Sequence, residues 1–204
     1  MTDIVFYFDF GSPYAYFARH KLVEIAARHG CGIDYRPIDL KRAKLESGNN
    51  GPPTVAIPNK LAFANRDFAR WAERYGVPFK SIGGIEGVRE LNIGALYALN
   101  RGQGAAYIER VFDHCWGHGG RPDDQAFVAG LIADMGWDAD DFRAFVASDA
   151  AAAKYESVFQ LAVADHVFGV PAFVIGDELW WGNDRLFMVD EYLAERAPAV
   201  QAAG

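Results

Sequence analysis

A serine stands where a β-branched and aromatic segment gives way to a helical pattern, in the motif Phe10-Gly11-Ser12-Pro13-Tyr14. Free backbone N–H groups and the positive end of a helix dipole meet at such a junction, so it stabilises an anion. The Ser12 hydroxyl can donate a hydrogen bond to a thiolate there. The alternative is that Ser12 only caps the helix. Ser12 is therefore the candidate catalytic residue.

A proline that enters a predicted strand, Pro171 after Val170, marks a second candidate site. Such a proline either leads the strand or follows a cis peptide bond, and the pattern alone leaves both open. A loop with a cis proline at this position can face the start of the first helix. The residue before the proline, here Val170, then offers its backbone N–H and C=O to an extended ligand.

A third candidate is the motif Trp181-Gly182-Asn183-Asp184-Arg185, which opens the last predicted helix. Asn183, Asp184 and the helix N-terminus would receive a ligand that carries an amine and a carboxylate at one end. A capped helix with a solvated Arg185 is the alternative.

A fourth candidate follows a loop rich in Gly, Asn and Pro, residues 46–59. The loop carries Asn49 and Asn50, and Lys60 comes directly after it. Lys60 would meet a carboxylate, although a lone lysine is more often a solvated surface group.

Other chemistries have weaker support in the sequence. His114 and His118 lie on one predicted helix face beside Cys115, but no further ligands of matching spacing occur nearby, so a zinc site is not expected. The chain has no phosphate-binding loop, no dinucleotide fingerprint and no Gly-x-Ser-x-Gly motif. Cys31 and Cys115 form no Cys-x-x-Cys pair, and we expect both to be free, buried thiols.

The elements that must position these groups follow from the hydrophobic periods. Residues 4–10 predict a buried strand, residues 14–30 a helix that stops at Gly30, and residues 32–37 a second, parallel strand. Residues 60–164 are helical in pattern. Residues 171–181 then predict a hairpin, which precedes a final helix.

This order predicts an α/β, thioredoxin-like fold, βαβ followed by ββα, with a large all-helical insertion. We expect a thioredoxin-like domain from residues 1–45 and 165–204, and a loop and helical insertion domain from residues 46–164. The tail from Ala197 to Gly204 is small and polar, and we expect it to be frayed.

Composition narrows the class of partner. The 204 residues are 51% hydrophobic, enough for a large core, and the formal net charge of −7 disfavours nucleic acid and anionic membranes. No apolar run approaches the ~20 residues of a membrane span. The N-terminal segment MTDIVFYFDF lacks the features of a signal peptide, so a cytoplasmic location is expected.

The motifs taken together resemble a known family. FYFDFGSPYAYFA, IDLKRAK, SGNNGP, DFARWAERYGVPF, VFGVPAF and WWGNDRLFM follow one another as in the kappa-class glutathione transferase group. Within that group, IDLKR and WWGNDRLFM are most similar to the 2-hydroxychromene-2-carboxylate isomerase family. The resemblance covers nearly the whole chain.

The resemblance implies a DsbA-like fold, glutathione as cofactor, a homodimer, and isomerisation of an aromatic carboxylate in naphthalene or related aromatic degradation. It places Ser12 in the slot of the first cysteine of redox relatives. It further implies glutathione contacts from Asn49 or the adjacent Asn50, Lys60, Val170, Pro171, Asn183 and Asp184.

We expect Phe10, Tyr14 and Trp181 to wall the aromatic ring and Lys60 to meet the substrate carboxylate. Gly11 stands where a larger apolar residue is common in the family, which would widen the pocket beside the serine. Two alternatives remain: a kappa-like glutathione transferase or peroxidase, and a non-catalytic, glutathione-binding DsbA-like protein. A dithiol oxidoreductase is least favoured, because Ser12-Pro13-Tyr14-Ala15 lacks both cysteines.

Overall fold

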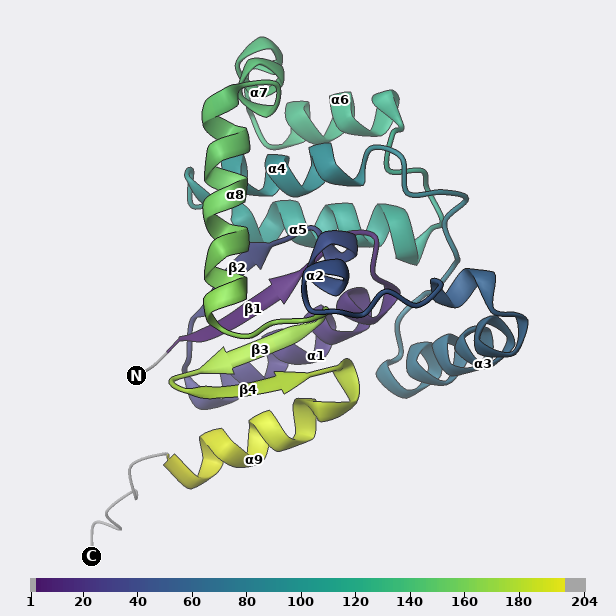
Figure 1. The fold of residues 1–204 in the computed structure, drawn as a ribbon. Coiled ribbons are helices and arrows are strands. Elements are labelled where there is room, and N and C mark those ends of the chain that lie inside the picture. Colours follow the sequence, from purple (N-terminus) through teal and green to yellow (C-terminus); the bar gives the residue numbers. More distant parts are fainter. Residues whose placement is uncertain (1–2, 197–204) are drawn as a thin grey trace, which may run out of the picture.

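A four-stranded mixed sheet lies at the centre of the computed structural model, which describes residues 3–196 (Figure 1). The expected frayed tail lies outside the described residues. The strand order is β2-β1-β3-β4; β1 and β2 are parallel, and β3 runs antiparallel to both β1 and β4. The predicted βαβ unit and hairpin are thereby confirmed. The strands are β1 (Ile4–Phe8), β2 (Ile33–Pro37), β3 (Ala172–Ile175) and β4 (Glu178–Trp181).

The helix α1 (Pro13–His29) has the ends that its sequence predicts. Ser12 is the N-cap, and Pro13 occupies the first helical position, where its missing N–H costs nothing. Gly30 ends the helix at a φ of 65°, a left-handed conformation that glycine adopts without a steric penalty.

The segment between β2 and β3 is helical, as predicted, and α9 follows β4 through a short 3₁₀ turn. In Figure 1, α8 lies in front of the sheet and α1 behind it, while α4, α5, α6 and α7 gather beside the β2 edge. The elements are α2 (Leu40–Glu46), η1 (Thr54–Ala56), α3 (Pro58–Tyr75), α4 (Val88–Leu99), α5 (Gly104–Phe112), the π-helical turn η2 (Asp113–Gly117), α6 (Gln125–Asp134), α7 (Ala139–Val146), α8 (Asp149–Ala164), η3 (Asn183–Arg185) and α9 (Leu186–Arg196).

The short helix α2 has no counterpart among the predicted elements. The Asp39 side chain caps it by accepting a hydrogen bond from the Arg42 N–H at 2.9 Å. Seven residues are too few for a clear helical period, so the cap is the stronger local signal. The loop that follows is irregular apart from η1, as expected.

The two faces of the sheet bury different sets of side chains. Phe6 and Phe8 alternate with Tyr7 along β1, so the two phenylalanines face α1 and Tyr7 faces the opposite layer with Phe159 of α8. The core on the α1 side continues into α5, because Phe8 contacts Phe112 at 5.8 Å between ring centroids. Across residues 3–196, every helix is too short or too polar to span a bilayer.

Candidate functional site

Three of the predicted segments meet at one edge of the sheet. The strand registers place Tyr7 opposite Ala172 and Ala172 opposite Trp181. The carboxyl end of β1 and the start of α1 therefore lie beside the start of β3 and the end of β4, at the end of the sheet nearest α3 (Figure 1). The Val170–Pro171 peptide bond is cis, which decides between the two alternatives for this proline.

Ser12 sits at the start of α1 with 3% of its surface exposed. Its Oγ accepts a hydrogen bond from the Ala15 N–H at 3.3 Å, so the serine caps the helix. Within residues 3–196, its hydroxyl hydrogen is donated to no acceptor. Ser12 is thus a helix cap that keeps one donor available at the positive end of a helix of 17 residues.

The turn before Ser12 is held from both sides by side chains far away in sequence. The Phe10 N–H donates to Asn92 Oδ1 of α4 at 3.2 Å, and the Phe10 carbonyl accepts from Trp116 Nε1 of η2 at 2.7 Å. The Gly11 N–H donates to Asp9 Oδ1 at 2.7 Å. No local sequence signal indicates the roles of Asn92 and Trp116.

Asp9 is a buried carboxylate beneath the same turn. Its Oδ2 accepts from the Leu40 N–H at 2.8 Å, so it also ties the turn to the start of α2. Burial raises the pKa of Asp9, and the hydrogen bonds from Leu40, Gly11 and Asn92 partly oppose that rise.

Val170 presents an unpaired stretch of backbone beside Pro171. Within the described part of the chain, neither its N–H nor its C=O has a hydrogen-bond partner. The Pro171 carbonyl, in contrast, accepts from the Gly182 N–H at 2.9 Å. Val170 therefore has a free donor and a free acceptor available to an extended peptide, where a buried backbone normally has both satisfied.

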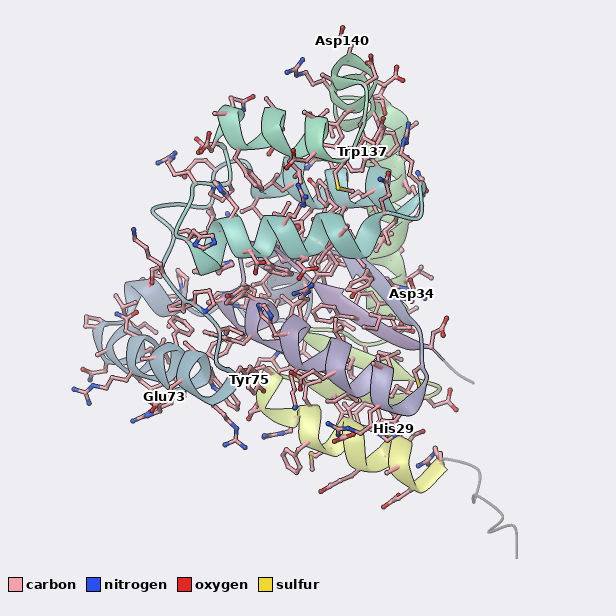
Figure 2. The ribbon with its side chains drawn as sticks, turned by 180° about the vertical axis from the view of Figure 1, so that it is seen from behind. His29, Asp34, Glu73, Tyr75, Trp137 and Asp140 are labelled. Carbon is pink, nitrogen blue, oxygen red and sulfur yellow. The ribbon has the colours of Figure 1, made fainter. Side chains whose placement is uncertain are left out.

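Asn183 opens η3 with 3% of its surface exposed, and its Nδ2 has no hydrogen-bond partner within residues 3–196. It lies beside Tyr75. The pKa of Tyr75 is raised, mainly by burial, and the Asn183 amide opposes part of that rise. Figure 2 shows Tyr75 at the end of α3 that faces the start of α9. A buried amide without a partner is costly, so a ligand acceptor fits this place.

The helix α3 is fastened over the start of α1. Tyr14 donates from its hydroxyl to Asp67 Oδ2 at 3.0 Å, and Trp71 Nε1 donates to the same oxygen at 3.1 Å. Burial first, then the Asp67 and Asp184 carboxylates, raise the pKa of Tyr14. Asp67 and Asp184 thus approach Tyr14 from two different elements, and sequence reasoning did not single out Asp67.

The sequence and the fold of this chain match those of known proteins. A family model described as a DSBA-like thioredoxin domain matches residues 3–194. A 2-hydroxychromene-2-carboxylate isomerase from Pseudomonas putida is 41% identical over 185 residues, which are 91% of each chain. One from Sphingobium xenophagum is 38% identical over 196 residues, 96% of this chain and all of that one. The chain belongs to the 2-hydroxychromene-2-carboxylate isomerase family.

Solved structures agree with this membership. The structure of a 2-hydroxychromene-2-carboxylate isomerase aligns with a TM-score of 0.89 at 39% identity and covers 95% of both chains. A probable DsbA oxidoreductase from Streptomyces coelicolor aligns with a TM-score of 0.75 at 18% identity, over 96% of this chain and 89% of that one. The latter likeness concerns the fold alone, and it agrees with the predicted thioredoxin-like class.

Two expectations about the aromatic wall need correction in this family member. The Phe10 ring is fully buried between Phe112, at 4.8 Å, and Tyr107, at 6.2 Å, so it belongs to the core and not to a substrate wall. The space beside Gly11 is not widened either, because a Cβ there would lie 3.2 Å from Asp9 Oδ1 and 3.7 Å from Val88 Cγ1.

Trp181 remains a candidate for the wall, since 51% of its surface is exposed. Its ring centroid lies 5.0 Å from that of Phe168, which is also exposed. Phe168 lies two residues before Val170, and the Trp181 indole lies against Gly169, so an open aromatic pair borders the free backbone. Sequence reasoning did not single out Phe168.

Asn49, Asn50 and Lys60 lie on exposed surface. The loop backbone is ordered by hydrogen bonds from the Asn49 N–H to the Lys44 carbonyl and from the Asn50 N–H to the Gly48 carbonyl. Lys60 lies in the first turn of α3 and forms no ion pair within residues 3–196. No contact in the described structure joins these three side chains to Ser12, so their roles stay predictions.

His114 has a stacking and a hydrogen-bond contact in the fold, and the two cysteines differ in burial. His114 stacks on Phe127 at 3.6 Å, and its Nε2 lies 3.1 Å from the Arg121 carbonyl. Cys115 is buried, which raises the pKa of its thiol to about 12, whereas Cys31 is only partly buried. Both are free thiols, as expected. Within residues 3–196, no three His, Cys, Asp or Glu side chains are placed to hold a metal ion.

Proposed function

We propose that this chain is a glutathione-dependent isomerase that converts 2-hydroxychromene-2-carboxylate to trans-o-hydroxybenzylidenepyruvate. The reaction is supported by relatives of that name at 38% to 41% identity over at least 91% of the chain. The cofactor is supported by the site. The single observation that carries it is the free hydroxyl of Ser12 at the start of α1.

The residues present fit a γ-glutamyl tripeptide with a central thiol. Val170 offers an unpaired N–H and C=O, which a peptide backbone satisfies. Asn183 offers a buried amide without a partner, next to the Asp184 carboxylate, which suits the amino-acid end of the ligand. Ser12 offers a donor where a thiolate would rest. Asn49 and Lys60 are proposed for the remaining carboxylate by family resemblance.

Ser12 and α1 have a defined energetic task. A free thiol with a pKa of about 8.5 is only a few per cent ionised at neutral pH. Lowering that pKa by ~2 units requires about 2.7 kcal/mol of preferential stabilisation of the thiolate. A partly buried helix N-terminus gives up to ~2 kcal/mol and a charge-assisted hydrogen bond ~1.5–3 kcal/mol. The two contributions together are sufficient.

When bound, glutathione supplies a nucleophilic thiolate whose reversible addition turns the substrate double bond into a single bond that can rotate. The chain must hold the aromatic substrate beside that sulfur. Trp181 and Phe168 offer exposed rings next to Val170, and the Tyr14 ring lies at the start of α1. Lys60 is proposed to meet the substrate carboxylate.

The test is to mix the purified protein with 2-hydroxychromene-2-carboxylate, with and without glutathione, and to follow the absorbance. We expect rapid conversion only with glutathione, and an unchanged amount of free thiol at the end. A fall in free thiol would favour the kappa-like transferase. Binding of glutathione without conversion would favour the non-catalytic binding protein. A homodimer and a cytoplasmic location stay predictions from the family resemblance.

A further inference from the structure

We propose that Asn92 and Trp116, two side chains of the helical insertion, are positioning residues that orient the turn carrying Ser12. Through that turn they set how strongly the serine stabilises a thiolate at the start of α1. The inference rests on the proposed function, because the thiolate is that of bound glutathione.

The two side chains hold the same residue from opposite sides. Asn92 Oδ1 accepts from the Phe10 N–H at 3.2 Å, and Trp116 Nε1 donates to the Phe10 carbonyl at 2.7 Å. The contacts join residues 82 and 106 positions apart, and both are buried. The N–H and the C=O of Phe10 are therefore both hydrogen-bonded to side chains of the insertion, and neither is bonded to the sheet.

Each of the two side chains is itself held firmly. Asn92 Nδ2 donates to the Ile38 carbonyl at 3.4 Å and to the Tyr155 hydroxyl at 3.2 Å. Together with its bond to Phe10, the side-chain amide is held by three separate segments of the chain. The Trp116 ring stacks on Phe79 with 3° between the ring planes. Trp116 also lies in η2, and such π-helical turns are frequent at functional sites.

The position of Phe10 determines that of Ser12 because the turn between them is short. The Ser12 N–H donates to the Asp9 carbonyl at 2.9 Å, and only Gly11, which has no side chain to pack, stands between Phe10 and Ser12. A rotation of the Phe10 peptide is therefore passed to the serine. Hydrogen bonds to a charged acceptor weaken steeply with poor distance and angle, so a small displacement of Oγ matters.

The charged groups that face this turn come from several elements. Asp9 lies beneath it, Asp39 lies near Asp9, and Asp67 and Asp184 approach Tyr14. Trp116 bonds none of these carboxyl groups, so a change in the pKa of the bound thiol in Trp116→Phe reports the geometry of the turn. Asn92 also helps to lower the pKa of Asp9, so Asn92→Leu alters both the turn and that carboxyl group.

The experiment compares Asn92→Leu and Trp116→Phe with the control Tyr107→Phe. Tyr107 is fully buried and donates from its hydroxyl to the Leu91 carbonyl, next to Asn92, at 3.1 Å. Tyr107→Phe removes this hydrogen bond from the same helix and keeps the ring that packs against Phe10. The pKa of bound glutathione is read from the ultraviolet absorbance of the thiolate, alongside kcat, KM and the free energy of unfolding.

We expect Asn92→Leu and Trp116→Phe to raise the bound-thiol pKa by about one unit, which lowers the thiolate fraction at neutral pH and kcat about threefold. Tyr107→Phe should lose stability and keep the wild-type thiol pKa. A merely structural role for Asn92 and Trp116 would move the unfolding free energy in all three variants and the thiol pKa in none.

The inference is overturned if folded Asn92→Leu and Trp116→Phe keep the wild-type thiol pKa, or if Tyr107→Phe shifts it equally. Should Asn92→Leu fail to fold, Trp116→Phe decides, since phenylalanine keeps a ring against Phe79. A wild-type protein that leaves the thiol pKa of glutathione unchanged would instead contradict the proposed function, and this inference with it.

Discussion

The side-chain oxygen of Ser12 lies 3.3 Å from the backbone nitrogen of Ala15. The residue that caps α1 is therefore the same residue that we propose stabilises the thiolate. The cap uses an acceptor lone pair of the hydroxyl and leaves its hydrogen available. Capping and the proposed thiolate binding are thus separate properties of one hydroxyl group, and they can be measured separately.

Replacing Ser12 by alanine should remove both properties. We expect Ser12→Ala to lower the free energy of unfolding by about 1 kcal/mol, the usual worth of an N-cap. We also expect turnover to fall at least about tenfold, because a charge-assisted hydrogen bond of about 1.5–3 kcal/mol is lost. Turnover at neutral pH and denaturant unfolding are the measurements.

The matched control is Ser148→Ala. Ser148 caps α8 through its Oγ, 3.1 Å from the Ala151 nitrogen, and its hydroxyl also donates to the Phe145 carbonyl at 2.7 Å. This variant should lose at least as much stability as Ser12→Ala and keep full turnover. Wild-type turnover in Ser12→Ala would be incompatible with the assigned role of the serine.

Asn183 should matter for binding more than for stability. Its Nδ2 makes no hydrogen bond of good geometry within the described residues and has only the Tyr75 hydroxyl nearby, so Asn183→Ala removes at most a weak contact at that atom. We expect the unfolding free energy to change by less than ~1 kcal/mol and the Kd for glutathione to rise about tenfold. Isothermal titration gives the Kd. An unchanged Kd would remove Asn183 from the binding site.

Phe10 should behave as a core residue. Its ring is fully buried against Phe112 and Tyr107, so Phe10→Ala is expected to cost about 3–5 kcal/mol of unfolding free energy. Trp181→Ala, at an exposed ring, should cost far less and raise the KM for the aromatic substrate. Denaturant unfolding checks the first result and steady-state kinetics the second. A cost below ~1 kcal/mol for Phe10→Ala would restore it as a candidate for the wall.

Asp9 predicts a pH dependence of stability. Burial raises the pKa of its carboxyl above the usual 3.8, so folding favours the protonated form. The contribution of Asp9 to the free energy of unfolding is then full at pH values below its pKa in the unfolded chain. It is lost as the pH rises through its pKa in the folded protein. The amide in the Asp9→Asn variant does not titrate, so the variant should gain stability relative to wild type as the pH rises from about 3 to about 7.

Chemical denaturation of Asp9→Asn and wild type at a series of pH values measures this difference. Acidic groups with lowered pKa values, such as Asp190 beside His29 and Arg28, are present in both proteins and cancel. Figure 2 shows His29 next to α9, at the opposite end of α1 from the altered turn. A difference that stays flat or falls with rising pH would contradict the predicted shift.

Local signals in the sequence were sufficient for the elements that form the site. Ser12, Pro13 and Gly30 mark the ends of α1 because capping chemistry acts over a few residues. The hairpin around Gly176 and Asp177 was likewise predictable from its turn and flanking strands. The cis bond before Pro171 could be assigned only from the structure, because the same dipeptide also suits a trans bond at the start of a strand.

The roles of Asn92 and Trp116 could not be predicted from local pattern. Each contacts Phe10 across more than 80 positions, and such contacts depend on how the insertion packs against the sheet. The burial of Phe10, in contrast, had a usable signal. Phe6, Phe8 and Phe10 are spaced two apart, so an extended chain places all three rings on one core face.

In the proposed mechanism, the start of α1 and Ser12 stabilise the thiolate of bound glutathione. Ultraviolet titration of glutathione bound to the wild-type protein tests it most directly. We predict that binding lowers the thiol pKa by about two units from its free value of about 8.5, and that Ser12→Ala loses most of this shift. A bound thiol that titrates at its free value in the wild-type protein would contradict the account.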